Sequence, residues 1–441
     1  MTSNINYLTL SDLSPAERAT LLRRTESDLW PFLEKVKPII EAVRKDGDRA
    51  LSLFAEQFDG ALVDETAIAA TPEDLDRAHR ELEADVREAI AFAAANIREF
   101  HELQKPEVSW SAEIRPGLHA GDRTTPIASV ACYIPRGKGA FPSTVLMTCI
   151  PASVAGVDDI CIVTPPGPDG HIDAASLVAA RAAGVSKVYK VGGAQAIAAV
   201  AYGTTTISKY AKVVGPGSPW VVAAKRLLAD LIDTGTPAGP SEAIIFADET
   251  TDGRLAALDL LIEAEHGDDS SAFIVTTSKE VADAALAAIP TYWHRMSAQR
   301  VNFTKAVLAS SRGGILLVKD TAEAMDFIND YAPEHLQILS KEPREYLPMI
   351  RNAGEILLGE HTPSTLGNFV LGPSHVLPTG GWAKSFSALS VHDFMKRTSI
   401  VEVTAQAYPE LAKHAGVIAK YEGFDAHANA VSDLRKKLLG N

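Results

Sequence analysis

A short apolar run, two glycines and an alanine-rich segment follow one another at residues 187–203, KVYKVGGAQAIAAVAYG. The first run is typical of a strand, and the alanine-rich segment is typical of a helix. The same alternation surrounds it. The other strand candidates are SVACYIP (129–135), ICIVTPP (160–166) and KVVGPG (212–217), and the other helix candidates are TVLMTCIPASVAG (144–156), AASLVAARAAG (174–184) and WVVAAKRLLADL (220–231). Repeated strand–helix units predict right-handed crossovers and a parallel, doubly wound sheet.

A second series of strand candidates begins near residue 243. They are AIIFAD (243–248), AFIVTTS (272–278), GILLVKD (314–320), LQILS (336–340) and GEILLGE (354–360), with helical patterns between several of them. The fold class is therefore α/β with two sheets, each with its own core. The first 120 residues and the stretch after about residue 390 have helical patterns instead. Ser14, Pro15 and Glu17 match a helix start with a capping box.

The composition of the 441 residues is that of an ordinary globular protein, with 46% apolar and 22% charged side chains. The net charge of −14 argues against nucleic acid or an anionic membrane as the main partner, because both require clustered Lys and Arg. Three cysteines cannot form a disulfide framework. Without a signal-peptide pattern or a long apolar stretch, we expect a cytoplasmic protein without a membrane span.

Glycines end two of the strand candidates and open the helices that follow. They stand in Val191-Gly192-Gly193-Ala194-Gln195 and in Val214-Gly215-Pro216-Gly217-Ser218. Glycine lets a ligand approach the backbone, and helix N-termini favour phosphate. Neither segment is the G-x-G-x-x-G of dinucleotide-binding folds, so tight turns alone also explain them.

Two pairs of acid and imidazole side chains are candidates for chemistry. Glu263 and His266 are three residues apart on a predicted helix, so they share one face and could bind one divalent metal; a plain helix end is the alternative. Glu334 and His335 stand just before a strand and suit general acid–base work near neutral pH; a surface turn is the alternative. Further candidates are His361, the segment 366–369, His375, Glu422 and His427.

Taken together, the ordered motifs resemble the histidinol dehydrogenase family from about residue 30 to 435. The matching stretches are CYIPRGKGAFPSTVLMTCIPASVAG (132–156), VGGAQAIAAVAYGT (191–204), VGPGSPWVVAAKR (214–226), PAGPSEAIIFAD (237–248), LLIEAEHGDDS (260–270), YAPEHLQI (331–338), GPSHVLPTGG (372–381) and HANAV (427–431). The resemblance implies a zinc-dependent, four-electron oxidation of an amino alcohol to an acid by two NAD in turn. It also implies two incomplete Rossmann-like domains with small helical termini, in an intertwined homodimer.

The implied domain division has four parts. Residues 1–28 would form an N-terminal helical arm, and residues 390–441 a C-terminal helical arm that completes the partner's site. Residues 29–132 and 243–389 would form a first α/β domain with the metal and catalytic residues. Residues 133–242 would form a second α/β domain on the NAD side.

The resemblance also implies roles for individual residues. Glu334 and His335 match the family's acid–base pair. The implied NAD contacts are Tyr133, Gln195 and Ser218; the implied metal ligands are Glu263, His266, Asn368 and His427, the last from the other subunit; and the implied substrate contacts are Ser241, Glu263, His266, His335, Asn368, Glu422 and His427.

The chain departs from the family pattern at four of its sites. Glu263 stands where the family has Gln, and Asn368 stands where it has Asp, so the ligand set keeps one carboxylate, one amide and two imidazoles. Such an exchange favours a retained zinc or other divalent ion; a lost metal site is the alternative, and His361 is a possible substitute ligand. Ser218 replaces an Asn, and Arg136 replaces a Gly and adds an anion-binding group.

These departures leave the substrate open but not the type of reaction. We expect an NAD-dependent dehydrogenase for a small polar primary alcohol, either L-histidinol or a related amino or hydroxy alcohol. The alternatives are a paralogue that oxidises another polyol or a sulfonated diol, which has precedent in the family, and a two-electron alcohol dehydrogenase. A non-catalytic metabolite-binding protein on the same fold is a further alternative, against which the intact Glu334-His335 pair argues.

Overall fold

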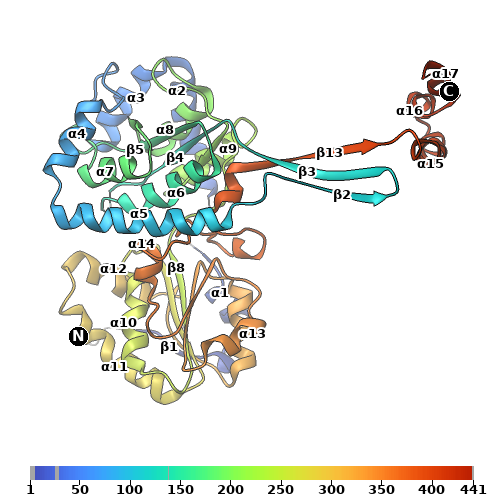
Figure 1. The fold of residues 1–441 in the computed structure, drawn as a ribbon. Helices are drawn as coiled ribbons and strands as arrows, with labels where there is room; N and C mark the ends of the chain where they lie inside the picture. Colours follow the sequence, from blue (N-terminus) through green and yellow to red (C-terminus); the bar gives the residue numbers. More distant parts are fainter. Residues whose placement is uncertain (1–4, 25–28, 138, 440–441) are drawn as a thin grey trace. The chain divides into compact units, whose positions relative to one another are not determined.

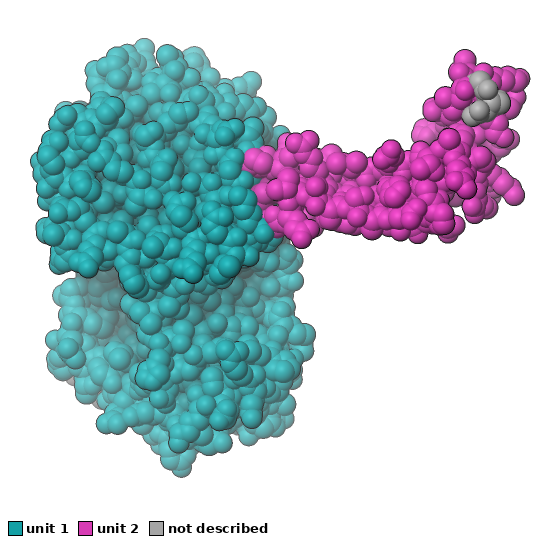
Figure 2. Space-filling model, in the orientation of Figure 1, with its two compact units in different colours: residues 1–105, 127–394 teal, residues 106–126, 395–441 magenta. Residues whose placement is uncertain are grey.

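A computed structural model of the chain describes residues 5–24, 29–137 and 139–439. The edges of the predicted arms, residues 1–4, 25–28 and 440–441, lie outside this range, as does Lys138. The chain divides into two compact units, coloured separately in Figure 2: unit 1 contains residues 1–105 and 127–394, and unit 2 contains residues 106–126 and 395–441. None of the described helices is both long and apolar enough to cross a bilayer.

The first predicted sheet is present in unit 1 as four parallel strands (Figure 1). They are β4 (Ser129–Tyr133), β5 (Asp159–Thr164), β6 (Lys187–Lys190) and β7 (Lys212–Val214), in the order β6-β5-β4-β7. The alternating helices are α6 (Pro142–Ala155), α7 (Ala174–Ala182), α8 (Gly193–Tyr202) and α9 (Pro219–Leu228). This confirms the strand–helix alternation that the sequence predicted.

The N-terminal helices of unit 1 pack against the helices of this four-stranded sheet. They are α2 (Trp30–Asp46), α3 (Asp48–Phe54), the π-helix η3 (Ala55–Asp59), α4 (Pro72–Glu81) and α5 (Ala84–Gln104). Helix α2 packs on α8 and α9, while α4 and α5 pack on α7. This differs from the expected division, in which residues 29–132 share a domain with 243–389. Apolar spacing identifies the buried face of a helix but not the sheet it covers.

The second predicted sheet of unit 1 has six parallel strands. They are β1 (Tyr7–Thr9), β8 (Glu242–Ala247), β9 (Ser271–Thr276), β10 (Gly313–Leu317), β11 (His335–Leu339) and β12 (Glu355–Leu358), in the order β1-β10-β9-β8-β11-β12. The accompanying helices are α1 (Pro15–Leu21), α10 (Gly253–Ala264), α11 (Lys279–Trp293), α12 (Ala298–Leu308), α13 (Thr321–Tyr331) and α14 (Ser364–Phe369), and the short 3-10 helices are η1 (Leu10–Asp12), η4 (Pro343–Met349), η5 (Trp382–Lys384) and η6 (Val391–Phe394).

The N-terminal segment is not purely helical as we expected. The predicted capping box is present at the start of α1, where the Ser14 side chain accepts from the Glu17 backbone N–H. Before it, however, β1 adds a parallel edge strand beside β10, with Leu8 opposite Leu316. Three residues are too few to show a strand periodicity, so this pairing leaves no signal in the sequence.

Unit 2 combines strands with helices, whereas we predicted a helical pattern on both sides of the central sheets. Its three-stranded antiparallel sheet contains β2 (Ser109–Arg115), β3 (Leu118–Pro126) and β13 (Met395–Val403), and its helices are α15 (Tyr408–Tyr421), α16 (Asp425–Ala430) and α17 (Asp433–Leu438). All of β2 and nearly all of β13 are exposed in the single chain. Strands without one buried face lack the alternation by which we recognise them.

Each sheet of unit 1 has a strand at which the direction of winding reverses. In the four-stranded sheet the chain moves from β4 to β5 and β6 and then returns to β7 on the other side of β4. In the six-stranded sheet it moves from β8 to β9 and β10 and returns to β11 beside β8. Such reversals open a crevice at the carboxyl ends of the two central strands.

Candidate active site

The predicted acid–base pair lies at the amino edge of the six-stranded sheet. His335 is the first residue of β11 and stands in register with Ala243 of β8 and with Glu355 of β12. Ser241 directly precedes β8, and Glu334 directly precedes β11. Parallel pairing therefore gathers the side chains at the starts of three neighbouring strands.

His335 is buried among three carboxylates. Its Nδ1 lies 3.0 Å from Glu355 Oε2, and its Nε2 lies 3.9 Å from Glu263 Oε1 and 4.0 Å from Glu334 Oε1. Burial alone would lower the pKa of this imidazole, but Glu263, Glu355 and Glu334 outweigh it and raise the pKa to about 10. The ring therefore donates from Nδ1 to Glu355, which fixes its orientation.

Glu334 is held by the neighbouring strand and by a buried ion pair behind it. Its Oε2 accepts a hydrogen bond from the Glu242 backbone N–H at 2.8 Å. Glu242 in turn accepts from Arg24 Nε at 2.7 Å and from the Gly380 N–H at 2.9 Å. Burial raises the pKa of Glu334 well above its ordinary value, although His335 opposes this shift. A carboxyl group in this state can keep a proton near neutral pH.

The predicted metal ligands of unit 1 meet next to His335. Glu263, near the end of α10, is fully buried, and its Oε1 accepts from Asn368 Nδ2 of α14 at 2.8 Å. Its Oε2 lies 3.3 Å from His266 Nδ1, which is also 2.7 Å from Ser241 Oγ. Burial raises the pKa of Glu263, but His266, His335 and Asn368 outweigh burial and lower it. Glu263 is therefore an ionised carboxylate at the centre of the cluster.

The predicted cofactor contacts lie at the reversal point of the four-stranded sheet. Tyr133 ends β4 and is buried, and its hydroxyl accepts from the Gly193 backbone N–H, at the start of α8, at 3.1 Å. Gln195 is buried in the first turn of α8, and Ser218 is the N-cap of α9. Gly215, with φ +112°, passes so close that an added Cβ would lie 2.1 Å from the Tyr133 carbonyl oxygen. Two helix N-termini thus open beside the end of β4.

The chain is similar to known proteins over nearly its whole length. A family model described as "Histidinol dehydrogenase" matches residues 22–435. The chain belongs to the histidinol dehydrogenase family. It is 60% identical to a "Histidinol dehydrogenase homolog 2" of Mesorhizobium japonicum, with 99% of both chains covered, and 46% identical to a histidinol dehydrogenase of Synechocystis, with 98% and 99% covered. The crystal structure of histidinol dehydrogenase from Elizabethkingia anophelis matches with a TM-score of 0.93 at 30% identity, covering 100% of both chains.

Membership of this family makes the protein an NAD-dependent oxidoreductase. It also confirms the expected fold of two parallel α/β sheets, which the solved histidinol dehydrogenase shares over its whole length.

The residues of one copy fit a divalent metal only in part. Among the described residues, no three His, Cys, Asp or Glu side chains gather as a metal-binding group. Glu263, His266 and Asn368 supply one carboxylate, one imidazole and one amide, and Glu263 Oε2 is buried without a hydrogen-bond partner in that range. A tetrahedral zinc site has four donors, so these three side chains would leave the fourth position to water, to substrate or to another side chain.

The remaining histidine candidates have different environments. His375 donates from Nδ1 to the Asn368 backbone oxygen at 2.6 Å, and its Nε2 lies 3.2 Å from Thr144 Oγ1. Burial lowers the pKa of His375 to about 4, so the ring is neutral and supports the backbone of Asn368. His361 is exposed in a turn. Glu422 and His427 are exposed in unit 2, at the end of α15 and on α16.

Several residues of the cluster escaped the sequence analysis. Glu355 orients His335, Glu242 positions Glu334, and Arg24 pairs with Glu242. The one available signal was position: Glu355 is the second residue of the strand candidate at 354–360, and His335 directly precedes the candidate at 336–340. Only the order of the strands, which sequence pattern does not give, makes β11 and β12 neighbours.

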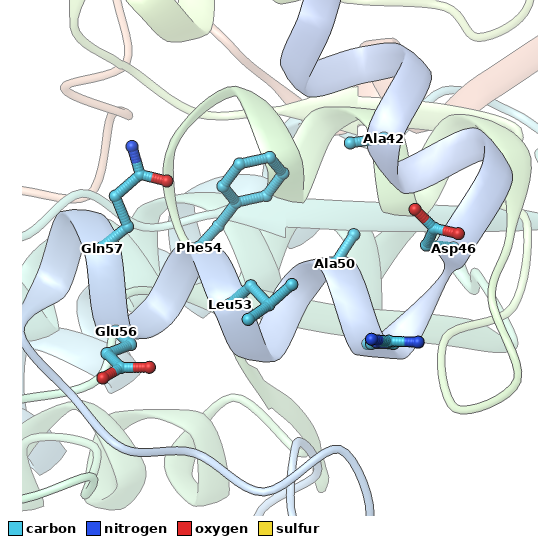
Figure 3. Close-up of a pocket in the computed structure, with 8 residues that line it drawn as sticks. Ala42, Asp46, Ala50, Leu53, Phe54, Glu56 and Gln57 are labelled. Carbon is cyan, nitrogen blue, oxygen red and sulfur yellow. The ribbon is translucent and has the colours of Figure 1, made fainter.

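The described part of unit 1 contains two hollows whose walls include none of the predicted catalytic, metal or cofactor residues. The first, of about 670 Å³, is lined by α2, α3 and η3 alone, and Figure 3 shows that its side chains come from one continuous stretch of residues 42–57. None of them is a predicted site residue. The second, of about 520 Å³, lies beyond the ends of β4 and β5 and is lined by Phe58, Asp59, Arg136, Gly137, Gly139, Ala140, Pro165, Pro166 and Pro168.

Proposed function

We propose that the protein oxidises a small polar primary alcohol, L-histidinol or a related amino or hydroxy alcohol, through a bound aldehyde to the acid with two NAD in turn. The observation that carries this proposal is the buried His335, held by Glu355 and facing Glu334 and Glu263 beside His266 and Ser241. A binding protein gains nothing from so many buried ionisable groups, because each costs desolvation energy.

The chain's own residues provide the proton transfers. Glu355 orients His335, whose Nε2 takes the proton of the alcohol. Glu263 is the carboxylate that raises the pKa of His335 most, so a cationic group that engages Glu263 brings that pKa down towards the range of a base. His335 then passes the alcohol proton on to water and takes a second proton from the water that attacks the aldehyde, while Glu334, which keeps its own proton, donates a hydrogen bond to the aldehyde oxygen. Ser241 and His266 would hold the polar end of the substrate.

A zinc or other divalent ion would be held by Glu263, His266 and Asn368 of one copy and by His427 of a second copy. When bound, the metal would polarise the substrate's ligating groups, and NAD would accept hydride. Glu263 Oε2 is buried, has no hydrogen-bond partner among the described residues and lies 3.3 Å from His266 Nδ1, which supports a cationic ligand at this place. Tyr133, Gln195 and Ser218 would contact NAD, because they surround the two helix N-termini at the end of β4.

We further propose that the protein is an intertwined homodimer in which unit 2 packs on the second copy. The sheet of unit 2 exposes large apolar side chains in the single chain, among them Trp110, Ile114, Ile400 and Val401. Apolar surfaces of this kind mark protein interfaces. Packing of unit 2 would bring Glu422, as a substrate contact, and His427, as a metal ligand, to the site of the neighbour.

The direct test counts NADH formed per alcohol consumed by the purified, zinc-loaded protein, with L-histidinol, other amino alcohols, polyols and a sulfonated diol offered in turn. Two NADH per molecule of one substrate, with acid as the product, supports the proposal. One NADH with released aldehyde indicates a two-electron dehydrogenase instead. Tight binding of a metabolite without NAD reduction on any alcohol would indicate a binding protein.

A further inference from the structure

The 520 Å³ cavity beyond β4 and β5 has two charged groups in its wall. Arg136 follows β4 after a short turn, and Asp59 is the last residue of the π-helix η3. The cavity lies at the carboxyl end of β4, the strand at which the winding of the chain through the sheet reverses. This is the end where ligands bind in open parallel sheets.

Arg136 is held against the loop that follows β5. An added Cβ at Gly167 would lie 2.6 Å from Arg136 Nη1, so the missing side chain of this glycine makes room for the guanidinium. Arg136 Nη1 is buried, and in the described part of the chain it has no hydrogen-bond partner. A buried, unpaired donor of a charged group is costly, which indicates that a ligand satisfies it.

Asp59 has a buried acceptor atom, which complements the buried donor of Arg136. Its Oδ2 is buried and likewise lacks a partner among the described residues. Burial raises the pKa of Asp59 to about 6, although the charge of Arg136 opposes this shift. Within the described ranges no salt bridge joins the two groups, so each keeps an unused hydrogen-bonding atom.

The cavity is close to the predicted cofactor contacts. Burial raises the pKa of Tyr133, and the charge of Asp59 adds to the shift, so the two side chains are near enough to interact. Tyr133 contacts the first turn of α8. A dinucleotide bound at the end of β4 would thus reach Asp59 and Arg136.

We propose that Asp59 and Arg136 are a specificity-determining pair of the cofactor site, in which Asp59 accepts hydrogen bonds from ribose hydroxyls of the dinucleotide and Arg136 donates to its diphosphate. This inference rests on the proposed function. A ligand that satisfies both groups must carry hydroxyl donors and an anionic group together, as a dinucleotide does. An inorganic anion would satisfy Arg136 but leave Asp59 without a hydrogen-bond donor, and a ribose 2′-phosphate would bring a second negative charge to Asp59 in place of a hydroxyl donor. The pair therefore selects NAD over NADP.

The test measures dinucleotide binding without any alcohol, by ligand-observed NMR titration of the full-length protein with NAD and with NADP. Arg136→Ala is expected to weaken NAD binding about tenfold or more, because a charge-assisted hydrogen bond is lost. Arg136→Lys keeps the charge and should bind NAD more tightly than Arg136→Ala. Asp59→Asn is expected to raise the ratio of NADP to NAD affinity about tenfold, because the repelling charge is gone while Arg136 remains.

Arg49→Ala and Asp46→Asn are the matched controls, since both residues line the hollow of Figure 3 instead. Both controls should bind NAD as the parent protein does, and the thermal unfolding midpoint of each variant reports whether it is folded. If folded Arg136→Ala and Asp59→Asn variants bind both dinucleotides like these controls, the inference is overturned and the proposed function stands. If the parent protein binds neither dinucleotide, the proposed function fails with it.

Discussion

The two sheets of unit 1 are wound in the same way but place their candidate ligands at opposite edges. In the four-stranded sheet, Tyr133, Gln195 and Ser218 lie at the carboxyl ends, where α8 and α9 begin. In the six-stranded sheet, Ser241, Glu334 and His335 lie at the amino ends of the strands. The same topology thus gathers a different set of side chains at each of the two edges.

Helix direction explains the difference. The N-terminus of a helix favours anions and its C-terminus favours cations. In the four-stranded sheet the carboxyl edge faces helix N-termini, which suits a dinucleotide phosphate. At the amino edge of the six-stranded sheet α10 ends just after Glu263, and α13 ends just before Glu334. That edge suits a metal cation and an imidazolium, as the proposed function requires.

The largest effect on turnover is expected at the amino edge of the six-stranded sheet. His335→Ala should lower kcat by about a thousandfold, because general acid–base catalysis contributes roughly a hundredfold to ten-thousandfold. Steady-state NADH formation with the best alcohol of the panel measures the loss. His361→Ala, at an exposed turn, is the control and should keep full turnover. Near-full turnover of His335→Ala would remove the proposed base from the mechanism.

The exchanged metal ligands provide a reciprocal test at the same edge. Glu263→Gln leaves the ligand set without a carboxylate and should reduce retained zinc at least tenfold, by analogy with the loss of a supporting ligand contact. The double variant Glu263→Gln, Asn368→Asp restores one carboxylate and one amide and should regain zinc. Metal content after dialysis, measured by mass spectrometry, decides the point. A double variant no better than the single one would show that the pair does not share a metal.

Glu355 should have a smaller effect, because it acts through His335. Glu355→Gln is expected to lower kcat by about tenfold to a hundredfold, as loss of an orienting partner does. It should also lower the pKa of His335, since Glu355 is one of the carboxylates that raise it; an NMR titration of the imidazole and the pH profile of kcat report this shift. Glu360→Gln, an exposed glutamate just after β12, should change neither. An unchanged pKa of His335 in Glu355→Gln would contradict the orienting role.

The smallest effect, on stability and on NAD binding, is expected at the carboxyl edge of the four-stranded sheet. Gly215→Ala places a Cβ 2.1 Å from the Tyr133 carbonyl oxygen and forces an alanine to φ +112°, so it should cost about 1–3 kcal/mol of stability and weaken NAD binding severalfold. Gly184→Ala shares the positive φ but would meet no atom within 4 Å, so it separates backbone strain from the close approach. Denaturant unfolding and NAD titration measure both effects. Equal behaviour of the two variants would mean that the approach of β7 to Tyr133 does not shape the cofactor site.

The sequence allowed most of unit 1 to be predicted, because most of its elements have a local pattern. Helical spacing predicted Glu263 and His266 on one face of a helix. Helix α10 ends at Ala264, so His266 lies just beyond it, but the two side chains still meet at 3.3 Å. The features that could not be predicted are those that depend on pairing between segments far apart in the sequence. The register of β12 with β11 brings Glu355 to His335, and β1 joins β10 with three residues. Strands exposed on both faces, as in unit 2, carry no alternation at all.

We propose that one active site combines residues of two copies, with Glu263, His266 and Asn368 from one and His427 from the other. Subunit complementation tests it directly: His335→Ala and His427→Ala chains, each inactive alone, are co-expressed with different tags, and the mixed dimer is purified. Each mixed dimer would contain one intact site and one doubly damaged site, so we predict about half of the parent activity per dimer. A mixed dimer as inactive as its two parents would contradict the claim, because it would mean that each site is built within one chain.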